Sequence, residues 1–239
     1  MATFALVHGA WHGAWCWESL APLLRHAGHD VVAMDLPCDD GEAGFDTYAD
    51  AVCDAIDGSE DVVLVGHSLG GLTVPLVAAR RPLRHLVYLC AAVPHIGRTF
   101  AQQLVDEPDM FNAACYAGLS ELDGQGRRKW VDDDLARALL YADCDRAVTD
   151  AALARLRPQA RFPYSVPFPL PAFPAVPTTS VICTEDRAIG PDWSRSVARG
   201  RLRADVVELP GSHSPFLSRP DALAALLVGL VENQALARS

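Results

Sequence analysis

The chain has 239 residues, of which 50% are hydrophobic and 21% are charged, and its formal net charge is −10. A globular composition of this length suits a single domain over residues 1–239 with a large core. The net negative charge leaves little to neutralise phosphates, which disfavours nucleic acid and anionic membranes as partners.

The first part of the chain alternates short apolar strands with helices. We expect strands at residues 4–7, 31–34, 61–65 and 85–92, and helices at residues 16–26, 45–56 and 69–81. Such alternation is typical of a parallel sheet whose two faces are covered by helices. The pattern therefore predicts an α/β fold.

Residues 94–177 interrupt this alternation. Helical patterns occur at residues 99–105, 132–141 and 150–157, and a proline-rich stretch follows at 158–177. We interpret 94–177 as an inserted helical cap whose prolines return the chain to the sheet in extended form. Beyond it the alternation resumes, with strands at 178–183 and 205–209 and helices at 191–201 and 220–231, which brings the sheet to about six strands.

Residues 62–72 read Val-Val-Leu-Val-Gly-His-Ser-Leu-Gly-Gly-Leu, a β-branched run followed by a helical pattern. Ser68 lies two positions from both Gly66 and Gly70, which is the Gly-x-Ser-x-Gly pattern in a strand–turn–helix context. A serine on such a turn projects its hydroxyl above the sheet, beside the free N–H groups of a helix start. Ser68 is therefore a candidate nucleophile. The alternative is a serine that only caps the helix.

A serine nucleophile needs a base and a group that orients the base. Among the eight histidines, His213 is best placed, because it follows the last expected strand at the edge where parallel sheets form sites. His67 is adjacent to Ser68, but side chains that neighbour each other on a sharp turn diverge. The acid is expected after strand 178–183, where Asp186 is the first choice and Glu185 the alternative.

The loop after the first strand is rich in small residues and is expected to line the site. A tetrahedral oxyanion needs preorganised donors, and we expect the backbone N–H groups of Ala10 and Leu69 to supply them. Gly9, Trp11 and His12 are candidate substrate-binding residues in the same loop.

No metal or other cofactor is expected. His8 and His12 have the spacing of helix-borne metal ligands, but they lie on a loop without a third ligand. The chain has seven cysteines, an odd number, and no C-x-x-C motif. This pattern favours free thiols in a reducing compartment. With no visible secretion signal and no apolar run long enough to span a membrane, a cytoplasmic location is expected.

These motifs together resemble the α/β-hydrolase superfamily, and more narrowly the branch that holds plant methyl esterases, hydroxynitrile lyases and bacterial esterases. The resemblance rests on Leu-Val-His-Gly-Ala-Trp-His-Gly-Ala-Trp at 6–15, Met-Asp-Leu-Pro at 34–37, Val-Gly-His-Ser-Leu-Gly-Gly at 65–71, Cys-Thr-Glu-Asp-Arg-Ala-Ile at 183–189 and Gly-Ser-His at 211–213. It implies a catalytic triad of Ser68, Asp186 and His213, with Ala10 and Leu69 as the oxyanion hole.

Two positions separate the chemistries of this branch. Its lyases place a threonine in the first loop and a lysine directly after the catalytic histidine, where this chain has Gly9 and Ser214. The resemblance therefore implies an ester hydrolase. Plant methyl esterases often carry an apolar residue where Ser214 stands, so the chain departs from them there.

The leading hypothesis is a serine hydrolase that acts on a small, uncharged or weakly polar carboxylic ester in an aromatic-lined, largely apolar pocket. Lyase, acyl-transfer or ring-closing chemistry on the same fold is the second hypothesis. A non-catalytic binding protein on a hydrolase scaffold is the third. The expected partner is a small-molecule ester, and the oligomeric state stays open, with a homodimer as one option.

Overall fold

A computed structural model describes the backbone of residues 1–238 and the side chains of residues 1–232. Its main element is a six-stranded sheet with the strand order β2-β1-β3-β4-β7-β8, in which each neighbouring pair is parallel. The strands are β1 (Thr3–Val7), β2 (Asp30–Met34), β3 (Val62–His67), β4 (His85–Leu89), β7 (Thr178–Cys183) and β8 (Asp205–Leu209). The predicted α/β fold with about six parallel strands is confirmed.

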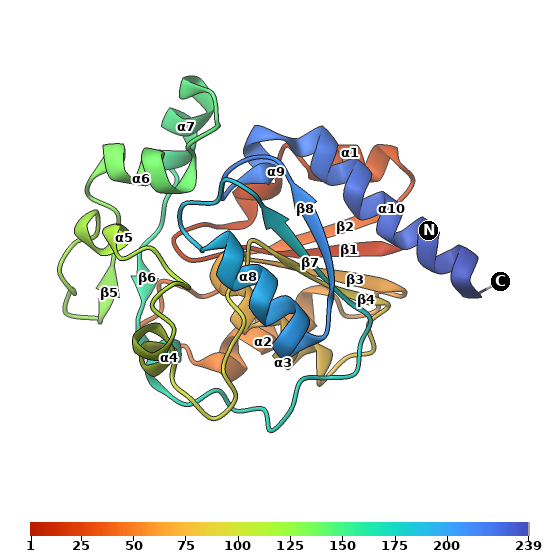
Figure 1. Cartoon of the computed structure of the whole chain (residues 1–239), viewed down its shortest axis with the longest axis horizontal. Coiled ribbons are helices and arrows are strands. Elements are labelled where there is room, and N and C mark those ends of the chain that lie inside the picture. Colours follow the sequence, from red (N-terminus) through yellow and green to blue (C-terminus); the bar gives the residue numbers. More distant parts are fainter. Residues whose placement is uncertain (239) are drawn as a thin grey trace.

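Helices cover both faces of this sheet (Figure 1). One face packs against α2 (Phe45–Ala55), α3 (Val74–Ala78) and α8 (Pro191–Val197), and the other against α1 (Ala21–His26), α9 (Pro215–Ser218) and α10 (Pro220–Arg238). Each face of the sheet has its own hydrophobic core, and alternate residues of one strand point into opposite cores. Leu64 packs on the face covered by α2, and Val65 packs on the face covered by α10. This explains why the strands are continuous apolar runs.

Three expected elements are shorter or more divided than their patterns suggest. The strand expected at 85–92 stops at Leu89, because Cys90 takes a left-handed φ of 46°. The helix expected at 16–26 is divided into η1 (Ala14–Trp17) and α1, and the one at 69–81 into η2 (Ser68–Leu72) and α3. Pro75 in the first turn of α3 suits a new helix start and not a helix interior.

The helices and short strands of segment 94–177 lie at one end of the sheet, away from the N-terminus, and the residues before β7 run back to the other end (Figure 1). Its elements are α4 (Phe100–Asp106), α5 (Ala114–Ala117), β5 (Arg127–Arg128), α6 (Asp133–Leu140), α7 (Arg146–Leu153), β6 (Gln159–Ala160) and η3 (Phe162–Ser165). Thr99 begins α4 with a capping box, and Asp132 begins α6 by accepting the Leu135 N–H at 2.9 Å. These short elements make the segment a compact layer above the sheet edge.

Two expectations for this segment were wrong. The helix expected at 150–157 is α7, which ends at Leu153 because the Arg157 N–H donates to the Trp11 carbonyl at 2.7 Å. The stretch 158–177 is not simply extended, since it begins with β6 and η3. β6 pairs with β5 in antiparallel register, Arg127 opposite Ala160. A pairing between two such short segments leaves no pattern in the sequence.

The seven cysteines are all free, and six of them are buried. Burial raises the pKa of the Cys38 thiol to about 11 and that of Cys115 to about 12, so these thiols stay protonated at neutral pH. They therefore act as small apolar side chains in the core. Within the described part of the chain, no helix has both the length and the apolar character to cross a membrane.

Candidate active site

Ser68 occupies the sharp turn at the end of β3, with a left-handed φ of 51°. The turn is possible because its flanking residues have no side chain. A Cβ at Gly66 would lie 2.6 Å from Cγ1 of Val74, and one at Gly70 would lie 2.8 Å from the His8 carbonyl oxygen. The close approach of other segments to the turn fixes Ser68 in a conformation that a serine rarely adopts.

Ser68, His213 and Asp186 form a continuous hydrogen-bond chain at the carboxyl ends of β3, β8 and β7. Ser68 Oγ lies 3.0 Å from His213 Nε2, and His213 Nδ1 lies 2.8 Å from Asp186 Oδ2. Asp186 Oδ1 accepts the N–H groups of Ala188 at 2.8 Å and Ile189 at 3.0 Å, which fixes the carboxylate. Since the carboxylate accepts the Nδ1 proton, His213 Nε2 is free to accept the Ser68 proton.

The two candidate acids differ in their contact with His213. Asp186 is buried at 8% exposure and reaches His213, whereas Glu185 is exposed to solvent. The backbone explains the difference, because the Glu185 N–H donates to the Gly211 carbonyl at 3.0 Å and turns its side chain away from the site. Asp186 was the first choice from sequence.

His67 has a role that the sequence did not indicate. Its side chain diverges from Ser68, as expected, but its Nε2–H donates to the backbone carbonyl of His213 at 2.9 Å. The two imidazole rings lie 4.7 Å apart. Burial lowers the pKa of His67 far below its usual range, so the ring is neutral and holds the backbone of His213 as a hydrogen-bond donor.

The loop after β1 lies directly against the nucleophile, since a Cβ at Gly9 would be 2.6 Å from Ser68 Cβ. His8 orients this loop: its Nδ1–H donates to the Gly9 carbonyl at 2.7 Å and its Nε2 accepts the Leu36 N–H at 2.9 Å. The Gly9 carbonyl and the Ala10 N–H belong to one trans peptide, so holding the carbonyl fixes the N–H in the opposite direction.

Neither predicted oxyanion donor is used elsewhere in the described part of the chain. No hydrogen bond takes the Ala10 N–H. Leu69 is the second residue of η2, and the first N–H groups of a helix have no carbonyl partner within it. Both donors therefore remain available beside Ser68.

Of the predicted substrate-binding residues, Trp11 lines the cavity and His12 does not. His12 is 1% exposed, its Nδ1–H donates to the Ala10 carbonyl at 2.8 Å, and its Nε2 accepts the Tyr141 hydroxyl at 2.8 Å. It lies behind the loop and supports it. Gly9 does not line the cavity; its lack of a side chain lets the loop backbone pass close to Ser68.

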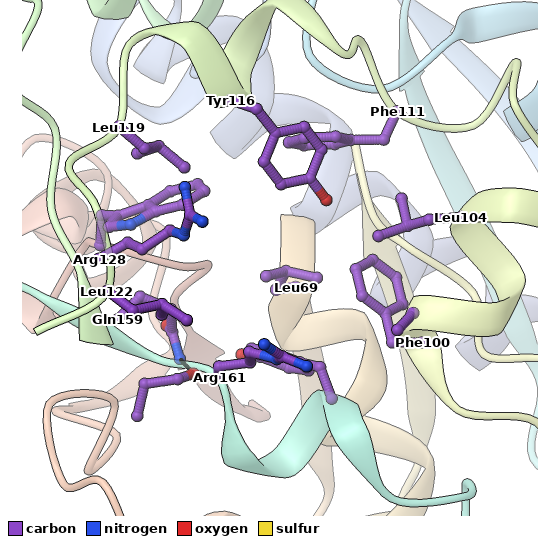
Figure 2. A pocket seen from close by; sticks show the side chains of 14 residues that line it. Leu69, Phe100, Leu104, Phe111, Tyr116, Leu119, Leu122, Arg128, Gln159 and Arg161 are labelled. Atoms are coloured by element: carbon purple, nitrogen blue, oxygen red, sulfur yellow. Dashed lines mark hydrogen bonds between the residues drawn. The ribbon is translucent and has the colours of Figure 1, made fainter. Parts of the chain in front are cut away.

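A cavity of about 290 Å³ opens beside the turn that carries Ser68, and Figure 2 shows its walls. Leu69 borders the cavity from the turn after β3, and Trp11 borders it from the loop after β1. Segment 94–177 supplies the other side chains. The lining residues are Trp11, Leu69, Phe100, Ala101, Leu104, Phe111, Tyr116, Leu119, Leu122, Arg128, Gln159, Ala160, Arg161 and Tyr164. The walls are mostly apolar and aromatic, as expected, but two arginines lie among them.

Asp143, in the segment above the sheet, is tied to the loop that carries His213. It accepts hydrogen bonds from the Ser212 hydroxyl and, at 3.3 Å, from Arg219 Nε. Because Ser212 directly precedes His213, this contact links segment 94–177 to the loop that carries His213. No sequence signal connects residues so far apart along the chain.

Lowering the pH below 6.5 is expected to destabilise the protein through its buried neutral histidines. Burial lowers the pKa of His8 from 6.5 to about 4 and that of His12 to about 3. The unfolded chain binds these protons as the pH falls below 6.5 and the folded chain does not. Each histidine should therefore cost about 1.4 kcal/mol of unfolding free energy per pH unit.

Urea unfolding at pH 7.0, 6.0 and 5.0 measures this slope, in a range where carboxylates are still largely ionised. His12→Asn should make the dependence shallower. A free energy of unfolding that does not change between pH 7.0 and 5.0 would contradict the assignment of neutral buried histidines.

Comparison with known proteins gives consistent matches over nearly the whole chain. A family described as "Alpha/beta hydrolase family" matches residues 4–226. Methylesterase 2 of Arabidopsis thaliana is 28% identical over 259 residues and covers 96% of both chains. A carbendazim hydrolyzing esterase of Nocardioides sp. (strain SG-4G) is 30% identical over an alignment of 248 residues, which covers 96% of this chain and 100% of its own.

An α-hydroxynitrile lyase of Arabidopsis thaliana is also similar, with 28% identity over 242 residues that cover 92% of this chain and 93% of its own. Among solved structures, the pyrethroid hydrolase PytH superposes with a TM-score of 0.85 at 22% identity, over 98% of this chain and 99% of its own. That likeness shows a shared fold.

Proposed function

Because the chain belongs to the alpha/beta hydrolase family, as its motifs predicted, we propose that it is a serine esterase that hydrolyses a small carboxylic ester. The observation that carries the proposal is the hydrogen-bond chain from Ser68 through His213 to Asp186. A serine hydroxyl is a poor nucleophile unless a base lies within hydrogen-bond reach, and this chain supplies one.

In the proposed reaction, Ser68 Oγ attacks the ester carbonyl while His213 Nε2 takes the hydroxyl proton. The N–H groups of Ala10 and Leu69 stabilise the oxyanion of the tetrahedral intermediate. His213 then returns the proton to the departing alcohol, which leaves an acyl group on Ser68. Water attacks this acyl-enzyme with His213 again as the base, and Asp186 keeps the imidazole in the required tautomer throughout.

The first loop and the residue after His213 support hydrolysis over lyase chemistry. Position 9 has no space for a side chain, because a Cβ there would lie 2.6 Å from Ser68 Cβ. Ser214 is fully buried, and it offers no positive charge beside His213 to stabilise a departing cyanide. The only lysine, Lys129, belongs to segment 94–177. We propose that this segment is a cap that selects the substrate, and that the enzyme works in the cytoplasm with its thiols reduced.

A panel of p-nitrophenyl esters tests the proposal, together with labelling by a serine-directed phosphonate. Ester hydrolysis and a covalent adduct on Ser68 are expected. Cyanohydrin cleavage faster than ester hydrolysis would favour the lyase alternative, and product partitioning towards an added alcohol would favour acyl transfer. A protein that forms no adduct at Ser68 would instead be a binding protein on this fold.

Gly9→Ala is expected to lower kcat by about 100-fold, because the added methyl group displaces the loop that holds the Ala10 donor. Steady-state kinetics with p-nitrophenyl acetate measure this loss. Gly124→Ala is a control, since a Cβ there meets no atom within 4 Å. Unchanged kcat in Gly9→Ala would show that Ala10 does not serve as an oxyanion donor.

A further inference from the structure

Two arginines that border the cavity differ from most arginines of the described chain. Most are paired with a carboxylate, as in the contacts of Arg155 with Glu18 and Arg201 with Glu107. Arg128 and Arg161 line the cavity, and no ion pair or hydrogen bond of either guanidinium exists within the described residues. Their positive charges are therefore available to a ligand.

The short strand β5 explains why Arg128 faces the cavity. Successive residues of a strand point to opposite sides. Arg127 is half-buried and points away from the cavity, where its Nε donates to Asp123 Oδ2 at 2.9 Å and its Nη1 donates to the Asp39 carbonyl at 3.1 Å. Arg128 points inward near Tyr116: burial raises the pKa of Tyr116, and the charge of Arg128 opposes that rise.

Arg161 reaches the same cavity from the partner strand. It follows β6, and its N–H donates to the Gly126 carbonyl at 3.0 Å, which extends the β5–β6 ladder by one bond. Figure 2 shows Arg128 on the side of the cavity opposite Phe100 and Leu104, and Arg161 below Leu69. The two guanidinium groups therefore border the cavity from different sides, among apolar side chains.

The cavity lining contains no acidic side chain, although acidic residues outnumber basic ones by 30 to 20 in the chain as a whole. Arg128 is half-buried and Arg161 is exposed at the cavity. Two guanidinium groups without a carboxylate partner on an acidic protein create a local field of the opposite sign. A neutral ester gains nothing from that field, whereas a carboxylate matches the planar fork of a guanidinium.

We propose that the physiological substrate is an ester that also carries a carboxylate, which Arg128 and Arg161 bind in this cavity. This inference rests on the proposed esterase function and replaces the uncharged substrate expected from sequence. The ester carbonyl lies beside Ser68, and the apolar side chains of the lining contact the carbon chain between the ester and the carboxylate.

The test compares mono-p-nitrophenyl esters of succinate, glutarate and adipate with neutral p-nitrophenyl esters of equal chain length. At least one anionic ester is expected to have a kcat/KM about tenfold or more above its neutral partner, since hydrogen bonds between charged groups are the strong ones. The preference should weaken as salt is added. The chain length with the highest kcat/KM reports how far the arginines lie from Ser68.

Arg128→Gln and Arg161→Gln should reduce the preference for the anionic ester over its neutral partner, mainly through KM. Arg127→Gln is the matched control, because it changes net charge equally on the adjacent residue, which does not line the cavity. Its preference should equal that of the wild type.

A neutral ester that exceeds every anionic partner would overturn the inference, as would an equal loss of preference in Arg127→Gln and Arg128→Gln. In either case Ser68-dependent hydrolysis of the neutral esters would leave the esterase proposal intact. Absence of hydrolysis for every ester, charged or neutral, would overturn both.

Discussion

Ser68→Ala is expected to lower kcat for p-nitrophenyl ester hydrolysis by about 10⁴-fold or more. Oγ is the atom that becomes acylated, so no other group of the site replaces it. The remaining rate should come from substrate binding and from the Ala10 and Leu69 donors, which still stabilise an oxyanion formed by attack of water. The position is small and buried, and alanine removes only the hydroxyl.

The matched control is Ser196→Ala, because Ser196 is an exposed serine on α8 and does not line the cavity. It should keep wild-type kinetics and wild-type phosphonate labelling. Ser68→Ala should lose the label while unfolding at nearly the same denaturant concentration. Undiminished hydrolysis in Ser68→Ala would remove Ser68 from the mechanism.

The strands and the positions of the site residues at their ends were predictable from the sequence, because both depend on local patterns. β-branched runs such as that of β3 mark buried parallel strands, and the carboxyl ends of such strands meet at one edge. That rule alone places Ser68, Asp186 and His213 together. The two glycines around Ser68 indicate close backbone approach without revealing which segments approach.

Features that depend on contacts between distant residues were not predictable. The contact of His67 with the His213 carbonyl joins residues far apart in the chain, and nothing in the sequence around His67 indicates it. The inward direction of Arg128 depends on the pairing of β5 with β6, each two residues long. With strands that short, no alternation of polar and apolar residues exists to show which face is buried.

Asp186→Asn is expected to lower kcat by about 10⁴-fold with little change in stability. The asparagine oxygen can still accept the N–H groups of Ala188 and Ile189, which now bond to Asp186 Oδ1. Its amide would then face His213 Nδ1 as a donor. That arrangement places the imidazole proton on Nε2, so His213 can no longer accept the proton of Ser68.

Glu185→Gln is the matched control, since it makes the same chemical change on the neighbouring acidic residue, which is exposed to solvent. Its kcat should stay within about twofold of wild type, and the pair of variants separates a loss of negative charge near the site from a loss of tautomer control. Equal losses in the two variants would mean that negative charge near the site supports catalysis, and not the specific hydrogen bond between Asp186 and His213. Full activity in Asp186→Asn would mean that His213 is oriented by its other contacts, of which the hydrogen bond from His67 to its carbonyl is the strongest candidate.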